Sequence, residues 1–334
     1  MVIAEVAQNH DGSLGMAHAF IDAVAESGAD AIKFQTHIAD AESTLDEPFR
    51  VRFSTQDKTR LDYWRRMEFT PDQWRELAEH ARQKGLIFLS SAFSVEAVQL
   101  LSEIGMPAWK VGSGEFQSYD LLEAMVKAGG PVLFSTGMAT RQEITKAVAW
   151  FRDQKVEHAI FQCTSIYPTP LEKTGLNFLD EFRNEFGCPV GLSDHSGTIY
   201  PGMAAMAQGA DLLEVHVTFH KGMFGPDVPA SITFEELRTL CLARDAFAVM
   251  NANPVDKEKQ AEELGNLRQI FGKSLAPVKK LEAGTILQPE LLTSKKPAGG
   301  ISPGEIQKLC GRRLIRTITP DRILSWKDIE GDEK

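Results

Sequence analysis

The chain has 334 residues, of which 43% are hydrophobic and 25% charged, with a formal net charge of −10. This length predicts one large domain and a smaller one, and the composition is that of a folded protein, not a disordered one. The acidic balance argues against broad binding to nucleic acid or to an anionic membrane surface. An anionic substrate would therefore need a local basic pocket.

Three further features bear on where the protein works. No apolar run reaches the roughly 18 residues that span a bilayer, and no basic segment precedes the first apolar residues as it does in a signal peptide. The four cysteines are scattered and form no CxxC pair, which is typical of reduced thiols. We expect a cytoplasmic protein with no membrane partner and no nucleic-acid partner.

Short apolar runs alternate with longer amphipathic stretches through most of the chain, which predicts parallel strands joined by helices. A helix is expected from about Gly15 to Ser27 and another from Pro71, where Thr70 is a good N-cap. The predicted strands are 2–6, 31–34, 86–89, 108–111, 131–134, 159–161, 190–192 and 212–215. Eight such units in about 250 residues predict an α/β fold of the (β/α)8 TIM-barrel type, and a doubly wound open sheet is the alternative.

An unusually long loop, residues 38–69, follows the second predicted strand. Long loops in compact domains are usually functional lids or disordered segments. Its basic and aromatic residues, among them Arg50, Arg60 and Trp64, favour a lid over the site. The alternative is a solvated excursion with a helix of its own.

The pattern changes after Met250, which divides the chain into three parts. Residues 1–250 are predicted to form the barrel, 251–272 a linker with a helical piece, and 273–334 a small, mostly β domain of short strands and turns. A domain of about 60 residues buries little core, so we expect it to dock onto something larger.

Polar residues end all eight predicted strands, which is where (β/α)8 enzymes place their chemistry. Packing alone does not explain this, because buried lysines and carboxylates are costly. Two of these residues, Lys33 and Lys110, suit a small phosphorylated anion together with serine hydroxyls. The serines are Ser91, Ser113, Ser135, Ser165 and Ser193. The glycines beside Ser113 permit close approach of the backbone, although an ordinary tight turn is the alternative reading.

His195 and His216 end adjacent predicted strands. Two neutral imidazoles there can share one cation, with oxygen ligands completing the shell. Such a site suits Mn²⁺ or Mg²⁺ better than structural zinc. The alternative is a pair of hydrogen-bonded core histidines.

Ten short motifs, in one order along the whole chain, carry a family resemblance. They are IAEVAQNHDGS (3–13), KFQTH (33–37), FLSSAFS (88–94), KVGSGE (110–115), STGM (135–138), QCTSIYPTP (162–170), GLSDH (191–195), EVH (214–216), GPD (225–227) and KPAGG (296–300). With them the chain resembles the sialic acid synthases, a family that comprises the N-acetylneuraminate synthases and their legionaminic and pseudaminic acid relatives.

The resemblance implies a (β/α)8 barrel followed by an antifreeze-like (SAF) domain, in a homodimer whose SAF domains each cover the partner's barrel. It implies condensation of phosphoenolpyruvate (PEP) with an open-chain N-acyl hexosamine of the N-acetylmannosamine type. The products are a nonulosonic acid and phosphate, formed by C–C bond formation and C–O cleavage.

The resemblance also implies roles for individual residues. His195 and His216 correspond to the ligands of a divalent metal, Mn²⁺ first, with Mg²⁺ or Co²⁺ as alternatives. The implied catalytic residues are Glu5, Lys33, Lys110, Tyr167 and Asp227. The implied substrate-binding residues are Gln35, Ser91, Ser113, Glu115, Ser135, Ser165, Ser193 and Lys296.

Three positions depart from the family pattern and leave the acceptor sugar unassigned. Lys296 stands where well-known relatives have an arginine, Val228-Pro229 follows Asp227, and some relatives have asparagine at the position of Ser165. Two other functions remain open from the residues themselves. One is a Schiff-base aldolase with Lys110 or Lys33 as nucleophile. The other is a non-catalytic sugar-binding scaffold.

Overall fold

The computed structural model describes residues 1–53 and 56–331. The chain forms two compact units, Met1–Ala252 and a second one from Asn253 onward, and each is described by itself. In the described part of the chain, no helix is both long and apolar enough to cross a membrane.

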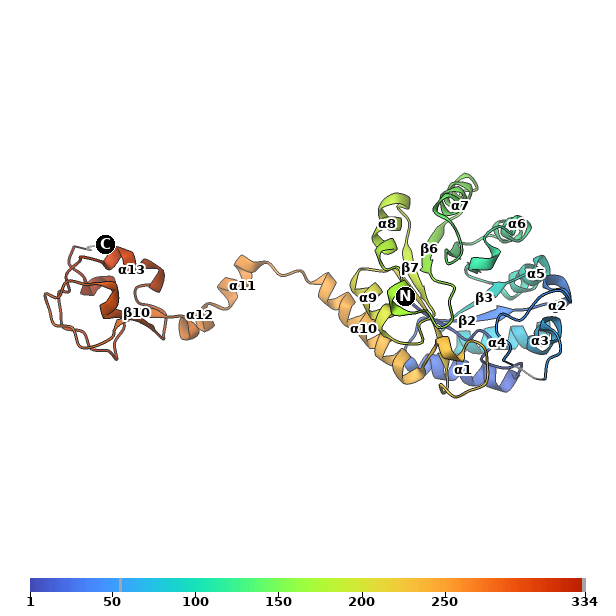
Figure 1. The fold of residues 1–334 in the computed structure, drawn as a ribbon, viewed down its shortest axis with the longest axis horizontal. Coiled ribbons are helices and arrows are strands. Elements are labelled where there is room, and N and C mark those ends of the chain that lie inside the picture. Colours follow the sequence, from blue (N-terminus) through green and yellow to red (C-terminus); the bar gives the residue numbers. More distant parts are fainter. Residues whose placement is uncertain (54–55, 332–334) are drawn as a thin grey trace. The chain divides into compact units, whose positions relative to one another are not determined.

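The first unit is a closed barrel of parallel strands with helices around it (Figure 1). Each strand pairs with the next, and β1 also pairs with β8, which closes the ring. The strands are β1 (Val2–Glu5), β2 (Ala31–Thr36), β3 (Ile87–Ala92), β4 (Trp109–Val111), β5 (Val132–Ser135), β6 (His158–Cys163), β7 (Val190–Asp194) and β8 (Leu212–Thr218). This confirms the predicted TIM barrel and excludes the doubly wound sheet.

Helices cover the outside of the barrel. The predicted start at Pro71 is confirmed, since the hydroxyl of Thr70 accepts from Gln73 N and the Gln73 side chain caps in return. The helices are α1 (Leu14–Ser27), α2 (Ala39–Glu42), α3 (Arg60–Met67), α4 (Pro71–Gln83), α5 (Val95–Ile104), α6 (Tyr119–Ala128), α7 (Arg141–Asp153), α8 (Asn177–Phe186), α9 (Tyr200–Ala207) and α10 (Phe234–Ala252). A short strand, β9 (Ser231–Thr233), pairs with β8 and brings the loop that carries Asp227 back beside His216.

Side chains that point into the barrel form two layers, because inward positions recur at every second residue of a strand. The lower layer is an apolar plug made of Ile3, Ala31, Leu89, Leu133, Ala159 and Phe161. Two residues further along the strands, the upper layer contains Glu5, Lys33, Ser91, Lys110, Ser135, Ser193 and Glu214. Beside the plug β7 carries Gly191, where a Cβ atom would lie 2.6 Å from the backbone oxygen of Leu212 and 2.9 Å from the Phe161 ring. The plug supports a floor of charged groups at the carboxyl ends of the strands.

The second unit has an aliphatic core of its own, which includes Leu275, Leu287, Leu309 and Leu324. Two antiparallel strands, β10 (Ser274–Pro277) and β11 (Leu292–Lys295), pair in it. Most of the predicted linker is helical, as α11 (Lys257–Glu263) and α12 (Gly265–Phe271), and α13 (Ile306–Leu309) lies further on. A small antiparallel sheet with short bridges agrees with the mostly β texture expected from the sequence.

Candidate active site

A pocket of about 520 Å³ opens at the carboxyl ends of the barrel strands. Every site residue that the sequence predicted within the barrel lines it: Glu5, Lys33, Gln35, Ser91, Lys110, Ser113, Glu115, Ser135, Ser165, Tyr167, Ser193, His195, His216 and Asp227. Lys296 belongs to the second unit, where its ammonium lies 4.9 Å from the centre of the Phe271 ring. The predicted barrel residues are thus brought together, and the role of Lys296 stays a prediction.

Four buried charged groups form the floor of the pocket. Lys33 Nζ lies 2.7 Å from Glu5 Oε2 and 3.9 Å from Glu214 Oε2. Lys110 Nζ lies 3.6 Å from Glu214 Oε1. All four side chains are at most 4% exposed, so each charge depends on the others for compensation. The ammonium groups of Lys33 and Lys110 therefore both face the pocket, and the carboxylate of Glu214 contacts both of them.

The protonation of the two carboxyl groups differs. Burial raises the pKa of Glu5, and the charge of Lys33 does not cancel this effect. Burial also disfavours ionisation of Glu214, but Lys110 and Lys33 outweigh it and lower the pKa of that carboxyl. Glu214 therefore stays ionised between the lysines, and Glu5 is the carboxyl group that takes up a proton more readily.

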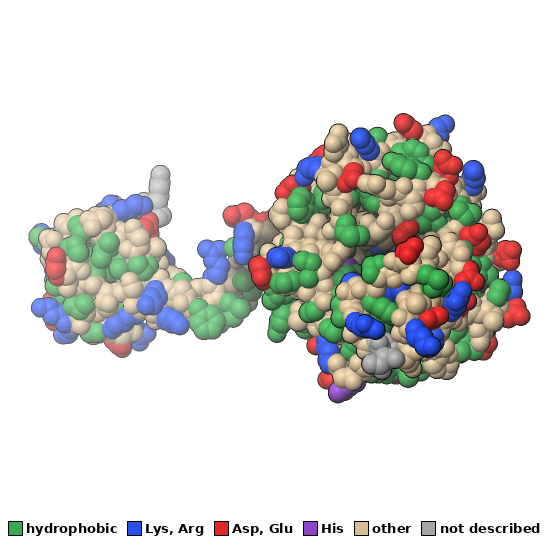
Figure 2. All heavy atoms as spheres, turned by 45° about the vertical axis from the view of Figure 1, so that its right-hand side comes forward, with side chains coloured by type: hydrophobic (Ala, Val, Ile, Leu, Met, Phe, Trp, Pro, Cys, Tyr) green, Lys and Arg blue, Asp and Glu red, His purple; other side chains and the backbone are tan. Residues whose placement is uncertain are grey.

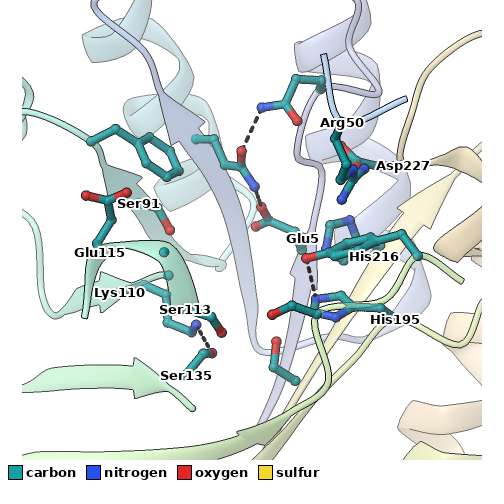
Figure 3. Close-up of a pocket in the computed structure, with 18 of the residues that line it drawn as sticks. Glu5, Arg50, Ser91, Lys110, Ser113, Glu115, Ser135, His195, His216 and Asp227 are labelled. Carbon is teal, nitrogen blue, oxygen red and sulfur yellow. Dashed lines mark hydrogen bonds and ion pairs between the residues drawn. The ribbon is translucent and has the colours of Figure 1, made fainter. Parts of the chain in front are cut away.

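Hydroxyl groups surround the lysines. Lys33 Nζ donates to Ser91 Oγ at 3.2 Å and Lys110 Nζ to Ser135 Oγ at 2.6 Å. Ser113 Oγ accepts from the N–H of Gly137 at 3.0 Å, and a Cβ atom at Gly137 would collide with the hydroxyls of Ser113 and Ser165. In Figure 3 Lys110, Ser113 and Ser135 gather on one side, opposite His195 and His216, with Glu5 between. Buried ammonium groups ringed by hydroxyls suit a small anion.

The two predicted metal ligands face each other. The rings of His195 and His216 lie 5.0 Å apart, centre to centre. His195 Nδ1 donates to the carbonyl of Thr164 at 3.1 Å, so its Nε2 carries the lone pair and accepts from the Tyr167 hydroxyl at 3.0 Å. Nδ1 of His216 is buried without a hydrogen-bond partner among the described residues.

The chemistry of this pair fits a divalent cation. Burial lowers the pKa of His195 and of His216 to about 3, so both imidazoles are neutral near neutral pH, as ligands must be. Within residues 1–53 and 56–331, no group of three or more His, Cys, Asp or Glu side chains could hold a metal ion. Water or substrate oxygens would have to complete the shell.

The far wall of the pocket combines a cation with aromatic and acidic groups. Arg50 Nη2 lies 2.9 Å from Asp227 Oδ1, and the guanidinium lies 4.1 Å from the centre of the Tyr167 ring. Glu115, on the opposite side in Figure 3, accepts from the Ser118 hydroxyl at 3.0 Å. Burial raises the pKa of Glu115. These groups offer both donors and acceptors to a polyhydroxylated ligand.

The long loop 38–69 combines features of both readings. It has two short helices of its own, α2 and α3, and a small apolar cluster that includes Tyr63 and Met67. It also forms a wall of the pocket through Arg50, Arg60 and Trp64. The sequence predicted a lid from these residues but gave none of them an individual contact, because local sequence does not tell where a long loop folds back.

Several lining residues were missed, and several motif residues proved structural. Glu214 received no role, although its spacing of two from His216 on one strand was a readable signal of a shared inward face. By contrast, Asn9 donates to the Val217 carbonyl at 2.7 Å and Asp194 accepts from Ser196 N at 3.0 Å. These two residues hold the loops in place around the pocket.

The fold and the pocket define a (β/α)8-barrel protein with paired lysines and a histidine pair at the carboxyl ends of its strands. Residues 20–253 match the model of the NeuB family, and residues 272–330 match that of the SAF domain. The chain therefore belongs to the NeuB family, and the resemblance read from its motifs is confirmed.

Curated relatives and solved structures agree with this membership. The chain is 31% identical to an N,N'-diacetyllegionaminic acid synthase of Campylobacter jejuni, over 97% of this chain and 98% of that protein. It is 32% identical to an N-acetylneuraminate-9-phosphate synthase of Mus musculus, over 100% of this chain and 93% of that protein. A crystal structure of N-acetylneuraminic acid synthetase from Leptospira borgpetersenii is similar, with a TM-score of 0.70 and 28% identity, over 80% of this chain and 90% of that one.

Proposed function

We propose that this protein is a PEP-dependent synthase that condenses PEP with an open-chain N-acyl hexosamine to give a nonulosonic acid and phosphate. The observation that carries the proposal is the convergence of all the predicted barrel residues on one pocket. Membership of a family whose curated relatives are named as sialic, legionaminic and pseudaminic acid synthases supports it.

PEP occupies the floor of the pocket in this proposal. Lys33 and Lys110 supply two positive charges beneath it, and the hydroxyls of Ser91, Ser113 and Ser135 supply directional donors around them. The visible face of the barrel unit carries interspersed acidic and basic side chains (Figure 2), so on this face no basic patch competes with the pocket for the anion.

The acceptor sugar lies above PEP, between the histidine pair and the wall made by Tyr167 and Asp227. A divalent metal held by His195 and His216, Mn²⁺ first, would supply Lewis-acid polarisation of the sugar aldehyde. The methylene carbon of PEP then attacks that aldehyde, and positive charge develops at C2 of PEP. The carboxylate of Glu214 beneath it, and Glu5 in its ionised form, stabilise this charge until water adds at C2 and phosphate leaves.

The two alternative functions are not favoured. A Schiff-base nucleophile needs a neutral amine. The partner carboxylates outweigh burial and raise the pKa of Lys33, which disfavours that residue as the nucleophile. Burial lowers the pKa of Lys110, so against Lys110 the argument rests on the family, whose curated relatives are named as acid synthases. A sugar-binding scaffold has no need of two buried lysines beside a histidine pair. The dimer with exchanged SAF domains and the cytoplasmic location stay predictions.

A phosphate-release screen tests the proposal. The purified full-length chain is mixed with PEP and Mn²⁺ and offered N-acetylmannosamine, its 6-phosphate or a diacetamido trideoxyhexose. Phosphate release that depends on one of these acceptors, with a nonulosonic acid as product, is the expected result. Release with none of them, by protein that has bound Mn²⁺, would contradict the proposal. Borohydride trapping of a substrate on lysine would favour the aldolase.

A further inference from the structure

A chain of hydrogen bonds, here called the Gln8 chain, joins the long loop to Glu5. Glu42 Oε1 lies 2.6 Å from His37 Nδ1, and His37 Nε2 lies 2.8 Å from Gln8 Nε2. Gln8 Nε2 also donates to Gln35 Oε1 at 2.7 Å, and Gln35 Nε2 donates to Glu5 Oε1 at 2.8 Å. The chain starts at the last residue of α2 and ends on the carboxyl group beneath the proposed PEP site.

The direction of the bonds in the Gln8 chain follows from the two amide nitrogens, which can only donate. Gln8 Nε2 faces His37 Nε2, so His37 Nε2 accepts and the ring proton lies on Nδ1, which donates to Glu42. Gln8 then gives one N–H to His37 and the other to the Gln35 carbonyl. The Gln35 carbonyl thereby faces Gln8, and its amide nitrogen donates to Glu5 with one further N–H left for the pocket.

The ring of His37 is fixed between two aromatic side chains. It stacks between the rings of Trp64 and Phe93. The ring centres lie 4.0 Å and 4.8 Å from that of His37, and the ring planes are inclined to it by 18° and 3°, respectively. Its side chain is 2% exposed and that of Glu42 is 6% exposed. A ring stacked on both faces cannot tilt, so its two nitrogens point along the chain and nowhere else.

We propose that His37 and Glu42 are positioning residues for the condensation, which act through Gln8 to hold the Gln35 amide with its N–H groups toward Glu5 and the acceptor sugar. The proposal rests on the proposed function, and it adds a requirement on the substrate. Gln35 keeps one N–H free for the sugar, so the sugar group that binds it must present an oxygen lone pair.

Two substitutions at one position separate hydrogen bonding from stacking. His37→Phe keeps an aromatic ring between Trp64 and Phe93 but removes both hydrogen bonds. His37→Gln gives up the ring, but its amide can accept from Gln8 and donate to Glu42. The proposal expects kcat/KM for the acceptor sugar to fall roughly tenfold in His37→Phe, with KM for PEP unchanged, and to recover in part in His37→Gln.

A role in packing alone gives the opposite order, with His37→Phe the more active variant. That order, wild-type acceptor kinetics in His37→Phe, or equal losses for PEP and sugar would each overturn the proposal. If His37→Phe does not fold, Glu42→Leu removes the outer end of the chain and leaves His37 between Trp64 and Phe93. The same selective loss for the sugar is expected, and its absence overturns the proposal.

A spectroscopic measurement makes the test independent of turnover. In wild-type protein with isotope-labelled histidine, long-range proton–nitrogen correlations should show His37, assigned by its loss in His37→Phe, as a neutral ring protonated at Nδ1. A ring protonated at Nε2 would reverse the Gln8 chain and end the proposal. Lack of PEP-dependent phosphate release by wild type refutes the proposed function instead, whatever this spectrum shows.

Discussion

The interior of the barrel contains an apolar layer and a charged layer of side chains. The charged layer lies two positions further along each strand. The lower layer is buried and apolar, and its members Leu89 and Phe161 are at most 1% exposed. The upper layer holds Lys33, Lys110 and Glu214, which are as deeply buried but depend on one another for charge compensation.

The difference separates stability from function along single strands. Burial of apolar groups in the lower layer stabilises the fold directly. Burial of paired charges in the upper layer contributes little net stability, because their desolvation offsets their attraction. The presence of these buried charges in the upper layer is therefore explained by the ligand that they bind, not by a gain in stability. Substitutions in the two layers should therefore have separable effects on unfolding and on turnover.

The largest effect on turnover is expected at the histidine pair, which lies above the upper layer. His216→Ala should abolish turnover with little change in Tm, because it removes one of the two proposed metal ligands and leaves the plug intact. EDTA should inactivate wild type in the same way, and Mn²⁺ should restore it. His158→Ala, at the amino end of β6, is the matched control and should stay active. Full activity of His216→Ala would remove the metal assignment.

The lower layer should show the reverse behaviour. Leu89→Ala should lower the free energy of unfolding by about 2–5 kcal/mol, the usual cost of a large cavity in a core. Its kcat per folded molecule should be unchanged well below the melting temperature. Ile87→Ala, on the same strand at a position that is 42% exposed, serves as the control. Loss of kcat in Leu89→Ala without loss of stability would contradict the separation of layers.

Lys110 tests the upper layer itself. Lys110→Met preserves most of the side-chain volume but removes a charge, so KM for PEP should rise roughly 10- to 100-fold, as expected for a hydrogen bond to a charged group. The requirement for the sugar should change much less. The exposed Lys146→Met on α7 controls for the loss of one positive charge. Equal effects on both substrates would mean that the anion binds elsewhere.

The smallest effect is expected at Lys296, outside the barrel. The resemblance implies that this residue serves the sugar site of a partner chain, so Lys296→Ala should weaken sugar use by roughly tenfold, about 1.4 kcal/mol. Mixed dimers of Lys296→Ala with His216→Ala should regain activity, because one site in each is then free of both defects. No recovery despite subunit exchange would show that the lid does not act across a dimer.

Most of the barrel and the centre of the site could be predicted from sequence, because both depend on local patterns. Alternation of apolar runs with amphipathic stretches predicts the strands, and polar residues at the strand ends, such as Lys33 and His216, mark the site. The chemistry of Lys33 and Lys110 follows from the cost of burying an ammonium group without partners.

The remainder depends on long-range placement that no local pattern encodes. Arg50 and Arg60 reach the pocket only because residues 38–53 and 56–69 fold back as a packed wall. The Gln8 chain needs the positions of Glu42 and Glu5 together. Asn9 has the residue type of a catalytic group and a place in a motif, yet it holds a loop, and only its contacts distinguish the two roles.

The closure of the ring has a consequence for how the protein is made. Glu5 pairs in register with Lys33 on one side and with His216 on the other, so the functional centre straddles the seam between the first and the last strand. A nascent chain on the ribosome holds Glu5 and Lys33 long before Glu214 and His216 are synthesised. Joining such distant segments is entropically slow. The active site is therefore complete only when β8 pairs with β1. A chain truncated before β8 lacks Glu214 and His216.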